Sequence, residues 1–402
     1  MKRIYYSSKK LMVFLYVLGI FPLLSENVVS TLFGELISKF LSVVSCFIIL
    51  IDIIRNKKIK LNPFLFFLFL AVVEHIIITF VFAPEDLIIS HYNNLITPYG
   101  LIAYFVLFCL ISANLNNKKH FLEILKAITI IMTISVFLNL FITGDFKIAD
   151  NIAVFQEAIT TGYTNSRKWL FGHRNMIFIH HLMWILVTYL YYEVSNKQKR
   201  KILFFEIIFT LLVGVVSWNT TMIVTTILMT SLWILKDTKF IKKIKPHYYI
   251  LFFAFLEIGI VFGRIQRHFE FLIVNILHRN LSFTGRTRIW DYYIQQFVSG
   301  SMFNKLFGNF GVTNINSNAH NMFLGLLAFS GIFGVVIYAI LIILAIVKIN
   351  RNNSHEIATF LSIIIFCFLI NSLTMEFYIQ PLIPLFFGYN ISDMILLKRG
   401  KL

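Results

Sequence analysis

Repeated apolar runs of about 16 to 25 residues, separated by short polar segments, dominate this sequence. A run of this length crosses a bilayer as a helix, because backbone groups in hydrocarbon must be hydrogen-bonded within their own segment. The runs lack the alternation of polar and apolar residues that is typical of transmembrane barrel strands. With 58% hydrophobic and 14% charged residues, the composition also excludes an ordinary soluble protein. We therefore expect an all-α integral membrane protein, with residues 1–402 forming a single polytopic domain.

Twelve of these runs are interpreted as membrane spans, so the connections between them alternate from side to side. The predicted spans are about 11–24, 36–54, 61–82, 95–112, 121–142, 175–193, 202–217, 220–235, 248–263, 321–347, 356–374 and 378–397. An even number of spans places both termini on the same side of the membrane. On the opposite side two connections are long, and we expect residues 143–174 and 264–320 to form two large extracytoplasmic loops.

The positive charge of the chain is distributed by side. The termini and the connections on their side hold 24 of the 36 Lys and Arg residues, which predicts that both termini are cytoplasmic. The opposite side holds ten cations, of which seven are arginine, and the guanidinium fork suits phosphate groups. An alternative is that these arginines contact lipid phosphates at the interface. A nucleic-acid partner is not expected, because no basic stripe interleaved with aromatics occurs in a soluble module.

Three cysteines and several ionisable residues lie inside the apolar runs. Cys46, Cys109 and Cys367 are expected to be small core residues, since none falls in a long polar segment. Ionisable groups are costly in hydrocarbon, so they either line a proton or substrate path or form structural pairs. They are Glu74, His75, His180, His181, Glu206 and Glu257. Because Glu206 is near the cytoplasmic end of its run, we expect it at the interface.

One polar segment between two spans carries a distinctive set of residues. It runs from Thr284 to Gly334, and a mere connection between helices would need only a few residues. Apolar residues recur with helical spacing in 288–298, including Trp290, which predicts a short amphipathic helix on the membrane surface with Trp290 in a packing role. The motifs in this segment are Gly285-Arg286…Trp290, Leu306-Phe307-Gly308 and His320-Asn321-x9-Gly331-x-x-Gly334.

His320 is the leading candidate for a catalytic residue. It stands where the tenth predicted span begins, preceded by Asn316-Ser317-Asn318, any of which is a suitable helix cap. The positive end of the helix dipole favours a neutral imidazole there, and a neutral imidazole at the water boundary can act as a general base. The competing interpretation is an interfacial histidine that only forms a hydrogen bond.

These motifs resemble the signature of the O-antigen ligase/polymerase superfamily, whose members act on polyprenyl-pyrophosphate-linked glycans at the outer face of the bacterial plasma membrane. The resemblance implies an inverting glycosyl transfer that needs neither a metal nor another cofactor. In this chain His320 corresponds to the histidine that assists the attacking hydroxyl, and Arg286 to an arginine that holds the leaving pyrophosphate. Independently of the resemblance, Arg174 and Arg264 are expected to bind substrate because each adjoins the outer end of a predicted span. Further candidates are Arg167, Arg288 and Asn321. One departure from the family pattern is 217–221, where many relatives have an arginine and this chain has none.

The resemblance does not separate two activities, a polysaccharide polymerase and a ligase that transfers the glycan to another acceptor. Richness in Phe, Ile, Lys and Asn fits an AT-rich genome of a kind common in Gram-positive bacteria, which lack lipopolysaccharide as an acceptor, so we favour the polymerase. The expected partners are polyprenyl-pyrophosphate-linked oligosaccharides and membrane lipids, with a chain-length regulator and a flippase as further candidates.

Two other functional classes fit the composition less well. A flippase for lipid-linked sugars would show repeat symmetry between its halves, yet loop 264–320 has no counterpart in the first half. A glycosyltransferase of the dolichol-mannose type would carry acidic residues in a large first outer loop, whereas that loop covers only about 25–35 here.

The predicted topology can be tested by labelling cysteines introduced on the two sides. In intact cells, a membrane-impermeant thiol reagent should modify a cysteine at position 309 and leave one at position 196 unmodified. The reverse labelling pattern would place the polar segment in the cytoplasm and remove it from its expected substrate.

Overall fold

The computed structural model describes residues 43–51, 54, 62–77, 96–141, 171, 174–197, 200–217, 219–239, 241, 244–276, 286–308, 319–373 and 380–400. In this part of the chain every regular element is a helix. The principal helices are α4 (Pro63–Ile77), α6 (Ile96–Asn114), α7 (Lys118–Phe141), α9 (Arg174–Val194), α10 (Arg200–Val216), α11 (Thr220–Ile234), α13 (Pro246–Val261), α14 (Arg286–Ser299), α15 (Met302–Phe307), α16 (Met322–Arg351), α17 (Glu356–Ser372), α18 (Leu382–Tyr389) and α19 (Ile391–Lys398).

The all-helical class is confirmed, and three described helices are long and apolar enough to cross a membrane. These are Lys118–Leu140, Ile177–Val194 and Met322–Arg351. Four shorter helices are also apolar: Pro63–Ile77, Leu101–Asn114, Pro246–Val261 and Glu356–Ser372. The first predicted span, 11–24, lies outside the described residues, and of the second, 36–54, helix is described at 43–51 and 54.

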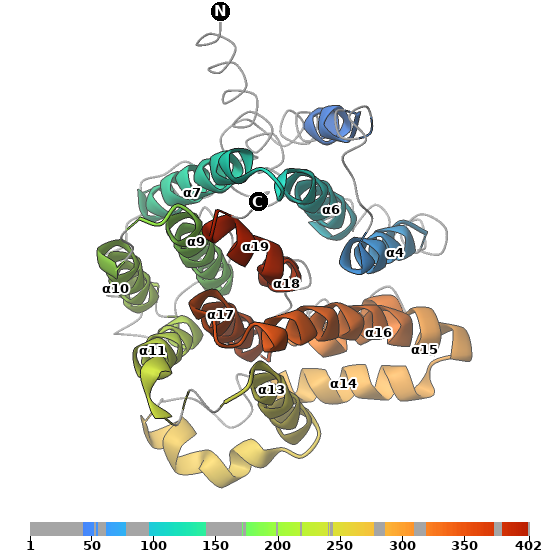
Figure 1. The fold of residues 1–402 in the computed structure, drawn as a ribbon. Coiled ribbons are helices and arrows are strands. Elements are labelled where there is room, and N and C mark those ends of the chain that lie inside the picture. The colour runs from blue at the N-terminus through green and yellow to red at the C-terminus, as the bar shows by residue number, and fades with distance from the viewer. Residues whose placement is uncertain are drawn as a thin grey trace, which may run out of the picture.

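The helices form a bundle with α17 and α18 near its centre (Figure 1). Nearly all residues of α17 and α18 are buried, as expected for helices that are apolar on every side. Helices α10 and α13 lie at the periphery and expose large apolar side chains such as Phe204, Leu212 and Phe255. An apolar outer surface of this kind suits contact with lipid. The three cysteines are buried and free, as predicted.

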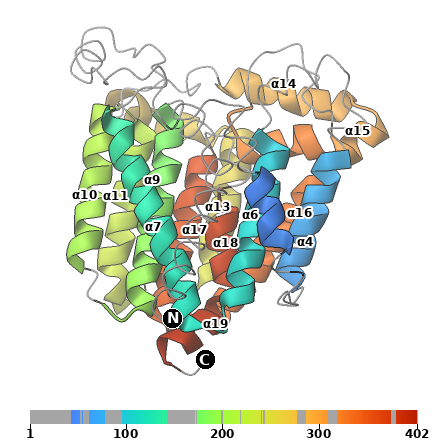
Figure 2. The ribbon, with the colours of Figure 1, turned by 90° about the horizontal axis from the view of Figure 1, so that it is seen from above.

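The two ends of the bundle differ in structure. The end that carries α14 and α15 is here called the upper end, and these two helices lie across one side of it rather than along the bundle (Figure 2). The opposite end, here called the lower end, holds α19 and the connections between α9 and α10, α11 and α13, and α16 and α17. The described residues of the connections between these helices therefore lie at the lower end, away from α14.

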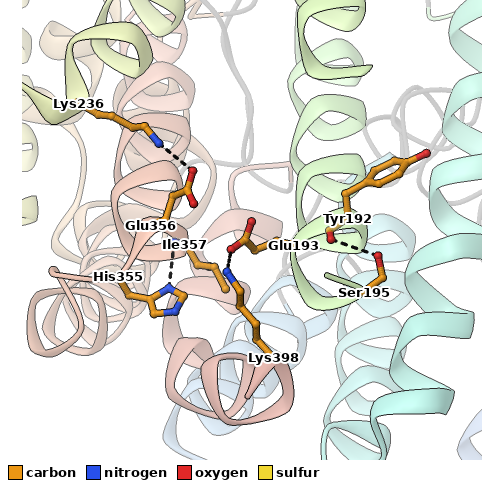
Figure 3. Close-up of polar contacts among 8 residues, drawn as sticks. All are labelled: Tyr192, Glu193, Ser195, Lys236, His355, Glu356, Ile357 and Lys398. Carbon is orange, nitrogen blue, oxygen red and sulfur yellow. Dashed lines mark hydrogen bonds and ion pairs between the residues drawn. The ribbon is translucent and has the colours of Figure 1, made fainter. Parts of the chain in front are cut away.

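At the lower end ion pairs join helices that are far apart in the sequence (Figure 3). Lys236, just after α11, donates to Glu356 at the start of α17 over 2.7 Å, and its ammonium also lies 4.0 Å from the ring of Trp233. Lys398 of α19 pairs with the buried carboxylate of Glu193 at the end of α9. A buried carboxylate that loses its cationic partner is costly, so this pair favours the position of α19 against α9.

Two details of the predicted spans are corrected. The expected span 378–397 consists of two short helices, because the backbone at Asn390 leaves the helical region (φ −92°, ψ 15°) and its side-chain amide bonds the Phe386 carbonyl over 2.9 Å. Glu206, expected at the interface, is buried in the bundle beside Thr188 of α9.

Helix α16 is also not the continuous span that the apolar run 321–347 predicted. Gly331 has φ 60° and ψ −158°, which interrupts the helix between 322–330 and 332–351. The first part lies beneath α14 and α15 across the upper end, and the second runs down through the bundle (Figure 2). Glycine adopts this conformation without the steric cost that a Cβ would add.

The break in α16 is held by direct contact between two stretches of backbone. A Cβ on Gly331 would lie 2.5 Å from the carbonyl of Leu306 and 2.6 Å from the amide nitrogen of Gly308. A Cβ on Gly308, which has φ 87°, would lie 2.2 Å from the carbonyl oxygen of Phe329. The Leu306-Phe307-Gly308 motif and Gly331 therefore form one packing unit, which joins the end of α15 to the turn in α16.

Replacing Gly331 or Gly308 with alanine should destabilise the protein strongly. Each substitution adds a positive-φ strain of about 1–2 kcal/mol and a clash with backbone that cannot move aside. Gly400 is a matched control, since it also has positive φ (69°) but has nothing within 4 Å of its Cβ position. Thermal denaturation in detergent should therefore show a much larger fall in Tm for Gly331→Ala and Gly308→Ala than for Gly400→Ala. Equal shifts in all three variants would argue against the backbone contact.

Candidate functional site

The candidate site lies at the upper end, where α14 crosses the end of α13 and the beginning of α16. The amphipathic helix predicted at 288–298 is confirmed as α14, Arg286–Ser299. Its buried residues are Trp290 and Tyr293, which pack with Val261, Ala319 and Leu324 in a small apolar cluster. This cluster fixes the segment 319–324, and so the position of His320, against α13 and α14.

Trp290 has the packing role that the sequence predicted. Its side chain is fully buried, and the indole Nε1 donates a hydrogen bond to the carbonyl of Ala319 over 3.0 Å. Because Ala319 directly precedes His320, this bond connects α14 to the backbone of the candidate catalytic residue.

Asn321 caps α16, in place of the residues at 316–318 that were expected to do so and lie outside the described part. Its backbone is extended (φ −155°, ψ 128°), and its side-chain oxygen accepts a hydrogen bond from the Leu324 amide over 2.9 Å. This is the geometry of an N-cap residue. The helix of α16 therefore begins at Met322, and His320 precedes the cap.

The amide nitrogen of Asn321 is bonded to two other helices. Its Nδ2 donates to Oε1 of Glu257 on α13 over 2.7 Å and to the carbonyl of Leu373, just after α17, over 3.3 Å. Asn321 is completely buried. Since its oxygen and its nitrogen both bond within the protein, Asn321 holds three helices together rather than presenting free groups to a substrate.

His320 lies between these two anchored neighbours in a strained conformation. Its φ is 51°, in the left-handed region, and its side chain is partly exposed. A residue other than glycine pays about 1–3 kcal/mol for a sparsely populated conformation of this kind, which persists only where the surrounding structure enforces it. Here Ala319 on one side and Asn321 on the other are both held by hydrogen bonds to other elements.

Arg264 reaches the beginning of α14 from the end of α13. Its Nη2 donates to the Asp291 carboxylate and, over 3.2 Å, to the carbonyl of Thr287, while the guanidinium lies 5.6 Å from the Trp290 ring centre. Its Nη1 is buried and has no hydrogen-bond partner among the described residues. A buried guanidinium nitrogen with unused hydrogens is a suitable donor for an anion.

The other arginines expected to bind substrate are placed unequally. Arg286 is partly buried in the first turn of α14, four residues before Trp290, and Arg288 is exposed in the same turn. Arg174 is the first residue of α9, and its side chain is not among those described, while Arg167 lies outside the described residues. The structure thus brings Arg264 to the helix end that carries Arg286 and Arg288, close to the anchor of His320.

Two acidic residues were not predicted to be part of this site. Glu257 was expected either to line a proton or substrate path or to form a structural pair, and it lies four residues before the end of α13 and bonds the cap of α16. Asp291 follows Trp290 and pairs with Arg264. In the sequence, the one indication of this role was that Glu257 lies in the second half of its apolar run, 248–263. Within the described residues, no group of three or more His, Cys, Asp or Glu side chains is arranged to hold a metal ion.

Comparisons with known proteins give no match to a family model, to a curated protein or to a solved structure.

Proposed function

We propose that this chain is a membrane glycosyltransferase that polymerises polysaccharide, transferring a polyprenyl-pyrophosphate-linked glycan to a lipid-linked repeat unit. The observation that carries this proposal is the position of His320, which is held in a strained conformation beside a helix end rich in arginine. A general base next to a cationic anion site is what transfer from a sugar pyrophosphate requires.

The arginines near the start of α14 would bind the pyrophosphate. Arg286 lies in the first turn and Arg264 reaches the Thr287 carbonyl in the same turn, where the positive end of the helix dipole also favours anions. In the transfer, the bond between the anomeric carbon and the phosphate oxygen breaks, and its electron pair leaves with the pyrophosphate. Guanidinium groups that are already in place stabilise this departing charge.

His320 would act on the acceptor. The acceptor hydroxyl attacks the anomeric carbon from the face opposite the pyrophosphate, which inverts the configuration, and its proton passes to the imidazole. A fixed imidazole near the acceptor raises the rate by orienting the hydroxyl as well as by removing its proton. The strained backbone at His320 fits this role, since strain is commonly stored where a side chain must be held in one orientation.

We also propose how the chain crosses the membrane. We infer twelve spans in the bacterial plasma membrane, with both termini in the cytoplasm and with residues 143–174 and 264–320 as outer loops. The upper end of the bundle is then the outer face. A polymerase holds two lipid-linked substrates at once, so Arg174 and Arg167 are assigned to the second phosphate group, while Arg264, Arg286 and Arg288 serve the first.

His320→Ala should reduce glycan transfer by about 10²–10⁴-fold, as is typical for the loss of a general base. Arg286→Lys should restore only part of the activity that Arg286→Ala removes, because lysine keeps the charge but lacks the planar fork. Turnover is measured with purified protein and a lipid-linked repeat unit. Arg267→Ala is the control, since Arg267 is exposed on the short helix after Arg264 and should not affect transfer. Full activity in His320→Ala would reduce this residue to an interfacial histidine.

Deletion of the gene should leave single repeat units on the lipid carrier and eliminate long chains, because a polymerase extends the glycan before its attachment. The lipid-linked glycans are extracted and their masses compared in deleted cells, in cells complemented with the unaltered gene and in cells complemented with His320→Ala. Only the unaltered gene should restore long chains. If long lipid-linked chains persist and only their attachment is lost, the chain is a ligase and not a polymerase.

A further inference from the structure

Glu257 is an acidic residue bonded to the segment that carries His320. It comes from α13, 64 positions before Asn321, and its Oε1 accepts a hydrogen bond of 2.7 Å from the Asn321 amide. A carboxylate forms a shorter and stronger hydrogen bond with such a donor than a neutral oxygen does. The contact is also shielded from water, since Asn321 is fully buried and Oε2 of Glu257 is buried as well.

The geometry points to Glu257 as a positioning residue that sets the orientation of the His320 imidazole through Asn321. This inference rests on the proposed function and deepens it by adding a residue that the motifs do not contain. His320 itself occupies the left-handed region at φ 51°, so the backbone would relax if either neighbour were released. Ala319 is held by the Trp290 indole, and Asn321 is held by Glu257 and by the Leu373 carbonyl.

The bond to Glu257 and the helix cap use different atoms of Asn321 and have different effects. The cap uses the side-chain oxygen of Asn321, which bonds the Leu324 amide, whereas the bond to α13 uses its nitrogen. The cap starts α16, and the nitrogen fixes where that start lies relative to α13. Arg264 also extends from the end of α13 to α14, so the same helix places the anion donor and the base. Because Arg264 and Glu257 both belong to the last part of α13 and the residues after it, the bond from Asn321 to Glu257 helps to set the distance between Arg264 and His320.

Two substitutions remove this bond from opposite sides while the cap is kept. Glu257→Ala removes the acceptor. Asn321→Asp removes the donor, and with it the bond to the Leu373 carbonyl as well, but keeps an oxygen that caps helices equally well. Each should lower kcat by about 10–100-fold with little change in KM, because a small misplacement of the base costs rate rather than binding. The double variant should be no worse than Asn321→Asp alone, since Asn321→Asp already removes the bond to Glu257.

Glu257→Gln should retain kcat within about threefold, because its amide oxygen still accepts the bond. Glu206→Gln is the matched control, since Glu206 is another buried carboxylate of the bundle, bonded to neither Asn321 nor His320 in the described structure. It should leave kcat unchanged. A purely structural role for Glu257 would instead lower the yield and Tm of Glu257→Ala and leave the kcat of its folded fraction intact, which would overturn the inference.

A second measurement does not depend on transfer activity. Diethylpyrocarbonate modifies exposed neutral imidazoles, and peptide mapping by mass spectrometry gives the rate at His320. The rate should rise several-fold in Glu257→Ala and Asn321→Asp and stay unchanged in Glu257→Gln and Glu206→Gln. If the unaltered protein transfers no glycan but these rates change as stated, the proposed function fails and the positioning of His320 by Glu257 stands. If the rates are equal in all variants, the positioning role is wrong whatever the activity.

Discussion

The contact between the backbones of Gly308 and Gly331 is the constraint on which the upper end of the molecule depends. A long apolar helix such as α16 would ordinarily continue straight across a membrane. The positive φ of Gly331 allows the first nine residues of α16 to lie across the bundle. The absence of a Cβ on both glycines lets the end of α15 pack directly against the turn at Gly331. The spacing of nine residues between Asn321 and Gly331 is therefore the length of one short helix, which begins at a cap and ends at a break.

This short helix gives the site its rigidity. Its first turn is tied to α13 by Glu257, to α17 by the Leu373 carbonyl and to α14 through the neighbouring Trp290–Ala319 bond. Elements of the bundle core thus support His320 at the upper end of the bundle. A loop alone would leave its imidazole free to rotate. Irregular backbone at membrane depth needs such internal partners, because hydrocarbon supplies none.

The sequence predicted the elements of this arrangement better than their connections. Periodicity alone placed α14 and the packing role of Trp290, since an amphipathic helix has only one way to bury its apolar face. Hydropathy placed most of the long helices but could not detect the interruptions at Gly331 and Asn390, because an apolar run has the same composition whether the helix in it is straight or broken. The partner of Asn321 was equally hidden: Glu257 precedes it by 64 positions, and only the packing of α13 against α16 brings them together.

The charge arrangement explains how such a site can be ready for an anion and yet stable without one. Asp291 accepts a hydrogen bond from Nη2 of Arg264, and the Asp291 side chain is 68% exposed. A pair with so exposed a carboxylate contributes little to stability, so an incoming anion with several oxygens, such as the pyrophosphate of the proposed substrate, would displace Asp291 at low cost. The buried Nη1 of Arg264 has no such competitor among the described residues. Arg264 is thus held in position by a weak, exposed partner and the Thr287 carbonyl, while its unused hydrogens remain for the phosphate. An arginine held in place before its anion arrives loses less side-chain freedom on binding, which is why a lysine with its flexible stem would serve this position poorly.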